Sequence, residues 1–405
     1  MRRAPLPFAE FVVLVALLFS LIAFGTDAML PAFPAIARDL GLEDANRAQL
    51  VLSAFVFGTG AGQLLTGPLS DALGRKPVIS FGILLFIAAC LMAYLAQTLE
   101  SMLLARFIQG VGISAPRTVA LAMVRDLHSG RMMARVMSVA MAIFVLVPAV
   151  APLIGQALFL AFGWRSIFLA FILFAGLALV WLNLRQPETL PPEARRRFRP
   201  SSLLAALAEV LANRVTMRCT LVLSLVFGAL FAYLSSAQQV FVDTYGKGTA
   251  FPAYFAGIAL ISGGAGFINA ALVLRLGMRA MVVTALALLL AGSLPMAGLL
   301  WSGGLRAGPE FGAFLAWSVL LFFVAGLTIG NLNALAMEPM GHIAGMASAI
   351  IGATATMLAM AVAVPVGLAF DGSALPLVAG TSLAGMAALG LMLTGPARKR
   401  APGRK

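Results

Sequence analysis

The sequence is poor in charge, cysteine and histidine. Of its 405 residues, 11% are charged and 61% are apolar, whereas a soluble globular chain has about 25% charged and about 45–50% apolar residues. So little charge cannot cover a surface in water, which argues against a soluble enzyme. The two cysteines, Cys90 and Cys219, lie in apolar stretches and exclude a disulfide framework or a metal cluster. The two histidines, His128 and His342, fall in predicted loops, which argues against an intramembrane protease dyad or a respiratory pump.

What the chain has instead is long stretches without Asp, Glu, Lys or Arg. A helix needs roughly 20 apolar residues to cross a bilayer core of about 30 Å. Eleven uncharged stretches reach or approach that length, the first only if Asp27 lies inside the span. A further apolar segment, residues 101–124, is interrupted only by Arg106 and Arg117. The sequence therefore predicts an all-α integral membrane protein with twelve transmembrane helices.

The surplus of basic residues follows the predicted loops. Lys and Arg number 28 against 15 Asp and Glu, and 21 of the 28 fall on the side that holds both termini. The positive-inside rule then places both termini in the cytoplasm. The cluster at residues 195–199 is also compatible with nucleic-acid binding, but topology accounts for it, and we expect no nucleic-acid partner. The first span follows two arginines as a signal peptide would; since no clean cleavage site precedes Asp27, we expect it to be retained.

The longest polar stretch divides the chain in two. It covers residues 186–213 and follows the sixth span, so that an N-terminal half, 1–185, and a C-terminal half, 214–405, each hold six helices. Two such halves joined by a basic cytoplasmic linker suggest a secondary transporter built from repeats. A channel would need rings of charge or a carbonyl filter, and a receptor or enzyme would need a larger polar domain.

Three ionisable residues remain inside the predicted spans, namely Asp27, Arg106 and Arg117. Such residues are costly in a membrane and are usually functional. A carboxyl group in low dielectric favours its neutral form, so Asp27 is a candidate for proton coupling; the alternative is a helix-end carboxylate bonded to neighbouring helices. Arg106 needs a carboxylate, carbonyls or a water-filled cavity as its partner. Arg117 lies nearer the cytoplasmic end of the same helix and could instead extend to the interface.

Several motifs resemble one known family. The loop after the second span reads GQLLTGPLSDALGRKPVI and resembles the signature loop of the major facilitator superfamily, in particular its bicyclomycin/chloramphenicol-resistance branch of drug:proton antiporters. In the same order follow TDAMLPAFPAI, RFIQGVG, RDLHSGRMMARVMS, PAVAPLIG, GWRSIFL and PETL, which look like that branch. The match covers most of the chain and is weaker in the C-terminal half. It implies a non-enzymatic, twelve-helix, alternating-access transporter of the bacterial inner membrane.

The resemblance also implies residue roles. A cytoplasmic latch that holds the outward-open state would comprise Gly67, Asp71, Gly74, Arg75 and Lys76, although the basic pair would also be explained by topology alone. The residue after the loop aspartate is usually basic in the family and is Ala72 here, which puts one latch contact in doubt. Asp27 and Arg106 match the branch's helix 1 aspartate and helix 4 arginine. The helix 5 antiporter motif would be represented by Pro148, Pro152 and Gly155.

These roles combine into one hypothesis. Asp27 binds a proton in the outward-facing state and releases it as substrate binds from inside, while Arg106 biases its ionisation. A mostly apolar cavity suits small amphiphilic drugs, and its expected lining is Phe24, Gln109, Tyr233, Gln238, Asn331 and Asn333. We expect a monomer in the lipid bilayer, driven by the proton gradient, with no metal or organic cofactor. The open alternative is an exporter of an endogenous metabolite, such as an amino acid derivative or siderophore.

Overall fold

The computed structural model describes residues 6–195, 198–303 and 307–394, and every regular element within them is helical. The long helices of the first half are α1 (Phe8–Asp27), α3 (Leu50–Leu73), α4 (Arg75–Tyr94), α5 (Leu99–Leu127), α6 (Gly130–Phe162) and α7 (Ser166–Arg185). Between α1 and α3 lie the turn η1 (Leu30–Ala32), the short α2 (Phe33–Asp39) and the turn η2 (Ala45–Gln49). Pro31 and Pro34 occupy the first turns of η1 and α2, where a missing N–H breaks no helical bond.

The second half repeats this pattern with one interruption. Its helices are α9 (Arg214–Gln239), α10 (Phe251–Ser262), α11 (Ala265–Leu276), α12 (Met278–Ser302), α13 (Ala307–Met337), α14 (Ala344–Leu368) and α15 (Leu375–Leu393). A π-helical turn, η4 (Val240–Thr244), extends α9, and a 3-10 segment, η6 (Glu338–Ile343), joins α13 to α14. Gly263 and Gly264 separate α10 from α11, which together form one passage. The helix α8 (Pro200–Ala212) lies between the halves in sequence.

The described residues contain eleven apolar stretches long enough to cross a membrane. One of them, Gly308–Leu368, is 61 residues long and holds both α13 and α14. At 1.5 Å per residue it would be about 90 Å long as a single helix, so it accounts for two passages. The prediction of an all-α membrane protein with twelve spans in two halves is therefore confirmed.

Corresponding turns in the halves use glycine in the same way. Gly74 joins α3 to α4 with φ of 107°, and Gly277 joins α11 to α12 with φ of 83°. Side chains other than glycine rarely adopt this conformation, so the two residues permit sharp reversals between successive helices.

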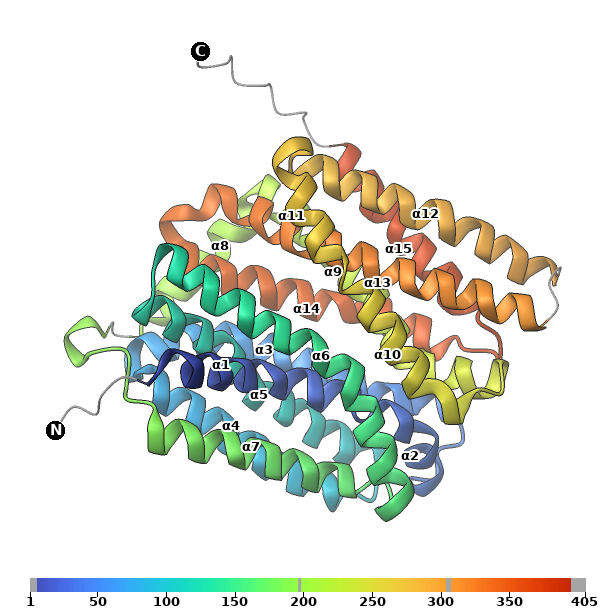
Figure 1. Ribbon diagram of the computed structural model, residues 1–405, viewed down its shortest axis with the longest axis horizontal. Coiled ribbons are helices and arrows are strands. Elements are labelled where there is room, and N and C mark those ends of the chain that lie inside the picture. The colour runs from blue at the N-terminus through green and yellow to red at the C-terminus, as the bar shows by residue number, and fades with distance from the viewer. Residues whose placement is uncertain (1–5, 196–197, 304–306, 395–405) are drawn as a thin grey trace, which may run out of the picture.

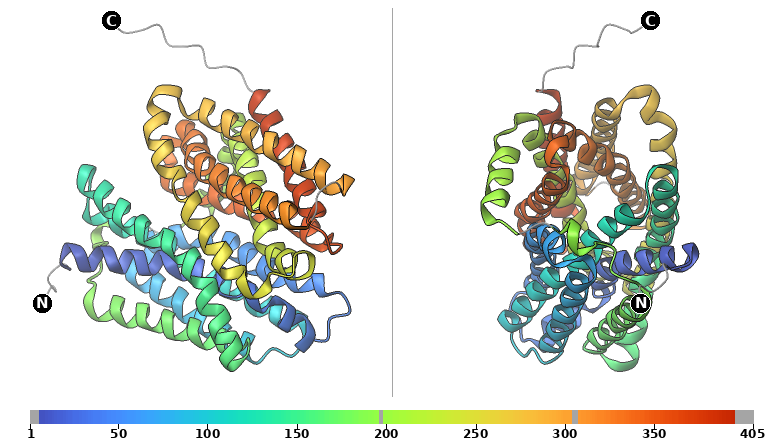
Figure 2. Two further views of the ribbon diagram at one scale, coloured as in Figure 1. Left: turned by 45° about the vertical axis from the view of Figure 1, so that its right-hand side comes forward. Right: turned by 90° about the vertical axis from the view of Figure 1, so that its left-hand side faces the viewer.

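The two halves lie one above the other in Figure 1, with α1 to α7 in blue to green and α9 to α15 in yellow to red. They meet mainly where α14 packs on α3 and where α10 packs on α6. In the view turned by 45°, the halves come together near α2 and α10 and diverge toward the start of α6 and the end of α11 (Figure 2).

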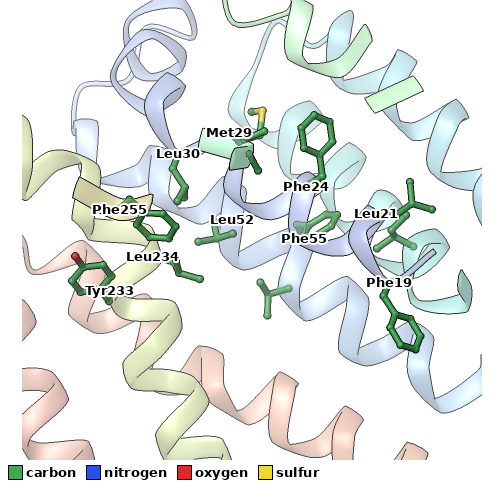
Figure 3. Packing of buried hydrophobic residues seen from close by; sticks show 14 of the residues in the cluster. Phe19, Leu21, Phe24, Met29, Leu30, Leu52, Phe55, Tyr233, Leu234 and Phe255 are labelled. Atoms are coloured by element: carbon green, nitrogen blue, oxygen red, sulfur yellow. The ribbon is translucent and has the colours of Figure 1, made fainter. Parts of the chain in front are cut away.

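An apolar core continues across the junction where the halves meet. Leu30 of η1 and Leu52 of α3 lie close to Leu234 of α9 and Phe255 of α10 (Figure 3). All four side chains are buried and belong to one cluster. Their packing closes the molecule near α2, at the end opposite the basic loops.

Candidate functional site

A cavity of about 320 Å³ lies between the halves. Its first wall is formed by α3, the start of α4 and one face of α5, and its second wall by α9, α13 and α14. The α5 residues of the wall recur at helical spacing and are Arg117, Thr118, Leu121, Ala122, Arg125 and Asp126. Because Asp71, Arg75 and Asp126 also line it, the cavity reaches the end of the molecule that carries the basic loops, which we call the basic end.

Arg117 lies deep in this cavity. It precedes Leu127, the last residue of α5, by ten positions, which corresponds to about 15 Å along the helix. The residue is nevertheless exposed, since the cavity runs alongside it. A guanidinium at mid-helix is therefore accessible from the space between the halves.

The opposite end is closed by a set of amide hydrogen bonds, which we call the amide network. Gln49 Nε2 donates to the carbonyl oxygen of Gly367 at 3.0 Å and to Gln239 Oε1. Gln239 Nε2 donates to Asn46 Oδ1 at 3.0 Å, and Asn46 Nδ2 donates to the carbonyl oxygen of Phe370 at 2.8 Å. Each of these bonds joins the two halves. The structure is thus closed near η2 and open toward the basic end.

The predicted latch residues Asp71 and Arg75 are brought together. Arg75 Nη1 donates to Asp71 Oδ1 and to Ser70 Oγ, and its Nε donates to Asp126 Oδ2 at 2.9 Å. The partners of this guanidinium all lie in the first half. Gly67 instead faces the second half, since a Cβ built on it would lie 3.9 Å from the Cβ of Ala349.

Glu188 holds the start of α4 beside Gly74. Its carboxylate oxygens accept the backbone N–H groups of Arg75 at 2.9 Å and Lys76 at 3.1 Å. Lys76 Nζ donates to the carbonyl oxygen of Gln186 at 3.0 Å. Sequence reasoning assigned no role to Glu188 or to Asp126, although both lie in quoted motifs, PETL and RDLHSG. Those motifs were the available signal for these two carboxylates.

Asp27 is the last residue of α1 and is 5% exposed. In the described residues it is the sole buried acid. Arg106 is fully buried and reaches the same helix two residues earlier, where its Nη2 donates to the carbonyl oxygen of Gly25 at 3.0 Å. Among the described residues, no hydrogen bond or ion pair links Arg106 to Asp27.

Backbone and ring groups surround the Arg106 guanidinium. Its Nε donates to the carbonyl oxygen of Val51 at 3.3 Å, and its Nη1 donates to Gln109 Oε1 at 2.7 Å. Its central carbon lies 4.2 Å from the ring centroid of Phe55. These dipoles and the ring face compensate the buried charge and tie α1, α3 and α5 together.

Of the six residues predicted to line the substrate cavity, Asn333 lies in the wall described above. Gln109 binds Arg106 and also donates to Cys90 Sγ at 3.2 Å. Asn331 Nδ2 donates to Asn269 Oδ1 at 2.7 Å.

The other three predicted residues are buried elsewhere. Phe24 borders an apolar pocket of about 420 Å³ among α1, α6 and α7. Tyr233 packs among Phe314, Trp317 and Phe322. Gln238 is 5% exposed.

The helix 5 motif lies beside the end of α1. A Cβ on Gly155 would lie 1.9 Å from the carbonyl oxygen of Ala28. Only glycine at this position therefore allows α6 to approach the end of α1 so closely. Pro148 and Pro152 lie within α6 on the preceding turns. The close approach occurs one residue after Asp27.

Comparison with known proteins gives a consistent result. Residues 15–364 match the family described as the Major Facilitator Superfamily. The chain is 33% identical over 355 residues to the uncharacterized MFS-type transporter YdgK of Bacillus subtilis, with 84% of each chain covered. It is 29% identical over 345 residues to a bicyclomycin resistance protein homolog of Haemophilus influenzae, with 84% of this chain and 85% of the relative covered.

Solved structures share the fold at lower identity. A D-xylose–proton symporter has a TM-score of 0.75 and 14% identity, with 95% of this chain and 97% of that chain covered. The human organic anion transporter MFSD10 has a TM-score of 0.63 and 20% identity, with 96% of this chain and all of that chain covered.

Proposed function

This chain belongs to the major facilitator superfamily, and on that premise we propose that it exports small amphiphilic molecules in exchange for protons. It is a membrane transporter and not an enzyme, as its motifs predicted. We further propose that it is a monomer of the bacterial inner membrane, with both termini and the basic end in the cytoplasm. In that orientation the structure represents an inward-facing state.

The observation that carries the proposal is the burial of Asp27 at the end of α1. An ionisable residue inside a membrane domain is costly to keep unless it is used. Its carboxyl group would bind a proton when the site faces outward. It would release the proton when substrate enters from the cytoplasm, so that no metal or organic cofactor is needed.

Arg106 would act by positioning. Its bonds to Gly25 and Val51 fix the backbone around Asp27 relative to α3 and α5. A rearrangement of α1 between states would then change the surroundings of the carboxyl group, as alternating access requires.

The substrate class rests on the cavity and on the printed names of relatives. A relative is named for bicyclomycin resistance. The cavity contains apolar side chains such as Phe227 and Met346 among polar ones such as Gln63 and Asn333, which suits amphiphilic molecules.

Transport into inverted membrane vesicles tests the proposal. Chloramphenicol, bicyclomycin, a sulfonamide and a dansylated amino acid are offered with and without an imposed pH gradient. The expected result is accumulation of at least one compound that depends on the gradient and is abolished in Asp27→Asn. Glu43→Gln, an exposed acid in the loop before η2, is the matched control and should transport normally. Gradient-dependent accumulation that persists unchanged in Asp27→Asn would refute the proposal.

A further inference from the structure

The cavity has an uneven distribution of charge. Its first-half wall includes three arginines, Arg75, Arg117 and Arg125, and two acids, Asp71 and Asp126. Its second-half lining has no charged side chain among the described residues. Positive charge therefore exceeds negative charge, and it lies on one side of the space.

Both acids are already engaged. Asp71 and Asp126 each form an ion pair with Arg75, which is itself buried. In the ranges that the structure describes, Arg117 and Arg125 have no carboxylate partner and no side-chain hydrogen bond. Two guanidinium groups thus remain available inside the cavity.

These two arginines lie on one stripe of α5. They are eight residues apart, about 12 Å along the helix, and both are exposed to the cavity. Arg125 lies close to the basic end, whereas Arg117 lies two turns deeper. An anion entering from the basic end would meet first one guanidinium and then the other.

The facing wall offers apolar and neutral polar surface at the level of this stripe. Met346 and Phe227 supply apolar contact, and Asn333, Ser348 and Thr356 supply neutral hydrogen-bonding groups. A molecule that places an acidic group on α5 can therefore place an apolar body against α14 and α9.

We infer that the cavity selects amphiphiles that carry an anionic group, typically a carboxylate, with Arg117 as its principal partner. The inference rests on the proposed export function and names the substrate class of the same site. Guanidinium and carboxylate form paired, charge-assisted hydrogen bonds, and a guanidinium without a partner favours such a ligand. A volume of about 320 Å³ is at the lower end of the range for small-molecule pockets.

A matched pair of probes tests the inference on the purified full-length protein. Chloramphenicol is neutral, and chloramphenicol succinate is the same phenicol bearing a carboxylate. Equilibrium binding is measured at one pH with no gradient, so the result does not depend on proton coupling. The wild-type protein should bind the succinate about tenfold more tightly than chloramphenicol, which corresponds to one hydrogen bond to a charged group.

Substitutions test whether Arg117 is responsible for the preference for chloramphenicol succinate. Arg117→Ala and Arg117→Gln should remove it, whereas Arg117→Lys should keep part of it. Arg131→Ala, an exposed arginine at the start of α6 that does not line the cavity, is the control and should bind as the wild type does. In the wild-type protein, added salt should weaken binding of the succinate and leave binding of chloramphenicol unchanged. Sodium acetate, which has no apolar body, should compete only at far higher concentration.

Equal affinities for the two probes, or no saturable binding of the succinate, would overturn the inference. So would a preference that survives in both Arg117→Ala and Arg117→Gln, or acetate competing as well as the succinate. Failure of the export proposal has a different signature: the binding preference persists while neither compound moves in response to a pH gradient.

Discussion

The Arg106 guanidinium donates a 3.0 Å hydrogen bond to the carbonyl oxygen of Gly25, two residues before Asp27. A fully buried cation is thereby attached to the backbone of the helix that carries the buried acid. The arrangement couples the position of the Asp27 carboxyl group to the packing of α1 on α5.

Arg106→Ala should destabilise the protein because it leaves the carbonyl oxygen of Gly25, near the end of α1, buried without a donor and also removes the bond to Val51. A buried acceptor left unsatisfied costs about 1–3 kcal/mol. Thermal unfolding in detergent should show a clear drop in midpoint, with a smaller drop for Gln109→Leu, which removes only one of the Arg106 bonds. A midpoint for Arg106→Ala equal to that of the wild type would contradict the positioning role.

Gly155→Leu should block the contact of α6 with α1. Even a Cβ at this position meets the carbonyl oxygen of Ala28 at 1.9 Å, so the helices must separate next to Asp27. Transport into vesicles should fall at least about tenfold, as a small misplacement of catalytic or binding groups commonly causes. Gly176→Leu on α7, where nothing lies within 4 Å of an added Cβ, is the control and should keep transport near the wild-type rate. Equal activity of the two variants would show that the close approach is unimportant.

Loss of the amide network should open the end near η2. The double variant Gln49→Ala/Gln239→Ala removes hydrogen bonds worth about 0.5–1.5 kcal/mol each, enough to shift the balance of states about tenfold. Spin labels on Glu43→Cys and Thr249→Cys, exposed sites on different halves, should report a larger population at long distance.

Thr244→Val is the control for that experiment. It removes the hydrogen bond from the Thr244 hydroxyl to the carbonyl oxygen of Gly372, which lies within the second half. The distance distribution should stay as in the wild type. If the double variant also leaves the distribution unchanged, the amide network does not hold this end closed.

Glu188→Ala should loosen the start of α4. The carboxylate accepts backbone N–H groups of Arg75 and Lys76, as a helix-capping residue does, and loss of such a cap costs about 0.5–2 kcal/mol. Thermal unfolding should report the loss. Glu193→Ala, an exposed acid in the same linker, should leave the midpoint unchanged. Identical unfolding midpoints for the two variants would show that Glu188 does not cap α4.

The sequence predicted the fold better than the site, for physical reasons. A long uncharged stretch indicates a membrane-spanning helix, whichever way that helix is rotated about its own axis. The sequence therefore predicted the twelve spans and their division into two halves. The sequence did not predict which face of each helix points toward the centre of the molecule, because a helix that is apolar on all sides has no polar stripe to mark that face. Phe24 therefore turned out to pack against Phe171 and Phe174 and not against the space between the halves.

Hydrogen-bond partners that lie far apart in the chain could not be predicted for a related reason. Asp126 is 51 residues from Arg75, and Glu188 is 113 residues from it. Helical spacing relates residues three or four apart and carries no information on such contacts. By contrast, Asp27 and Arg106 were identifiable because charge within an apolar span is rare in itself.

Proton release on substrate binding tests the central claim, that Asp27 is the coupling group, most directly. The purified protein in weakly buffered detergent solution is mixed with a saturating amount of the compound that the vesicles transport fastest, and a pH indicator is read. The wild-type protein and Glu43→Gln should release protons. Asp27→Asn should bind the compound and release none, whereas proton release by Asp27→Asn equal to that of the wild type would contradict the account.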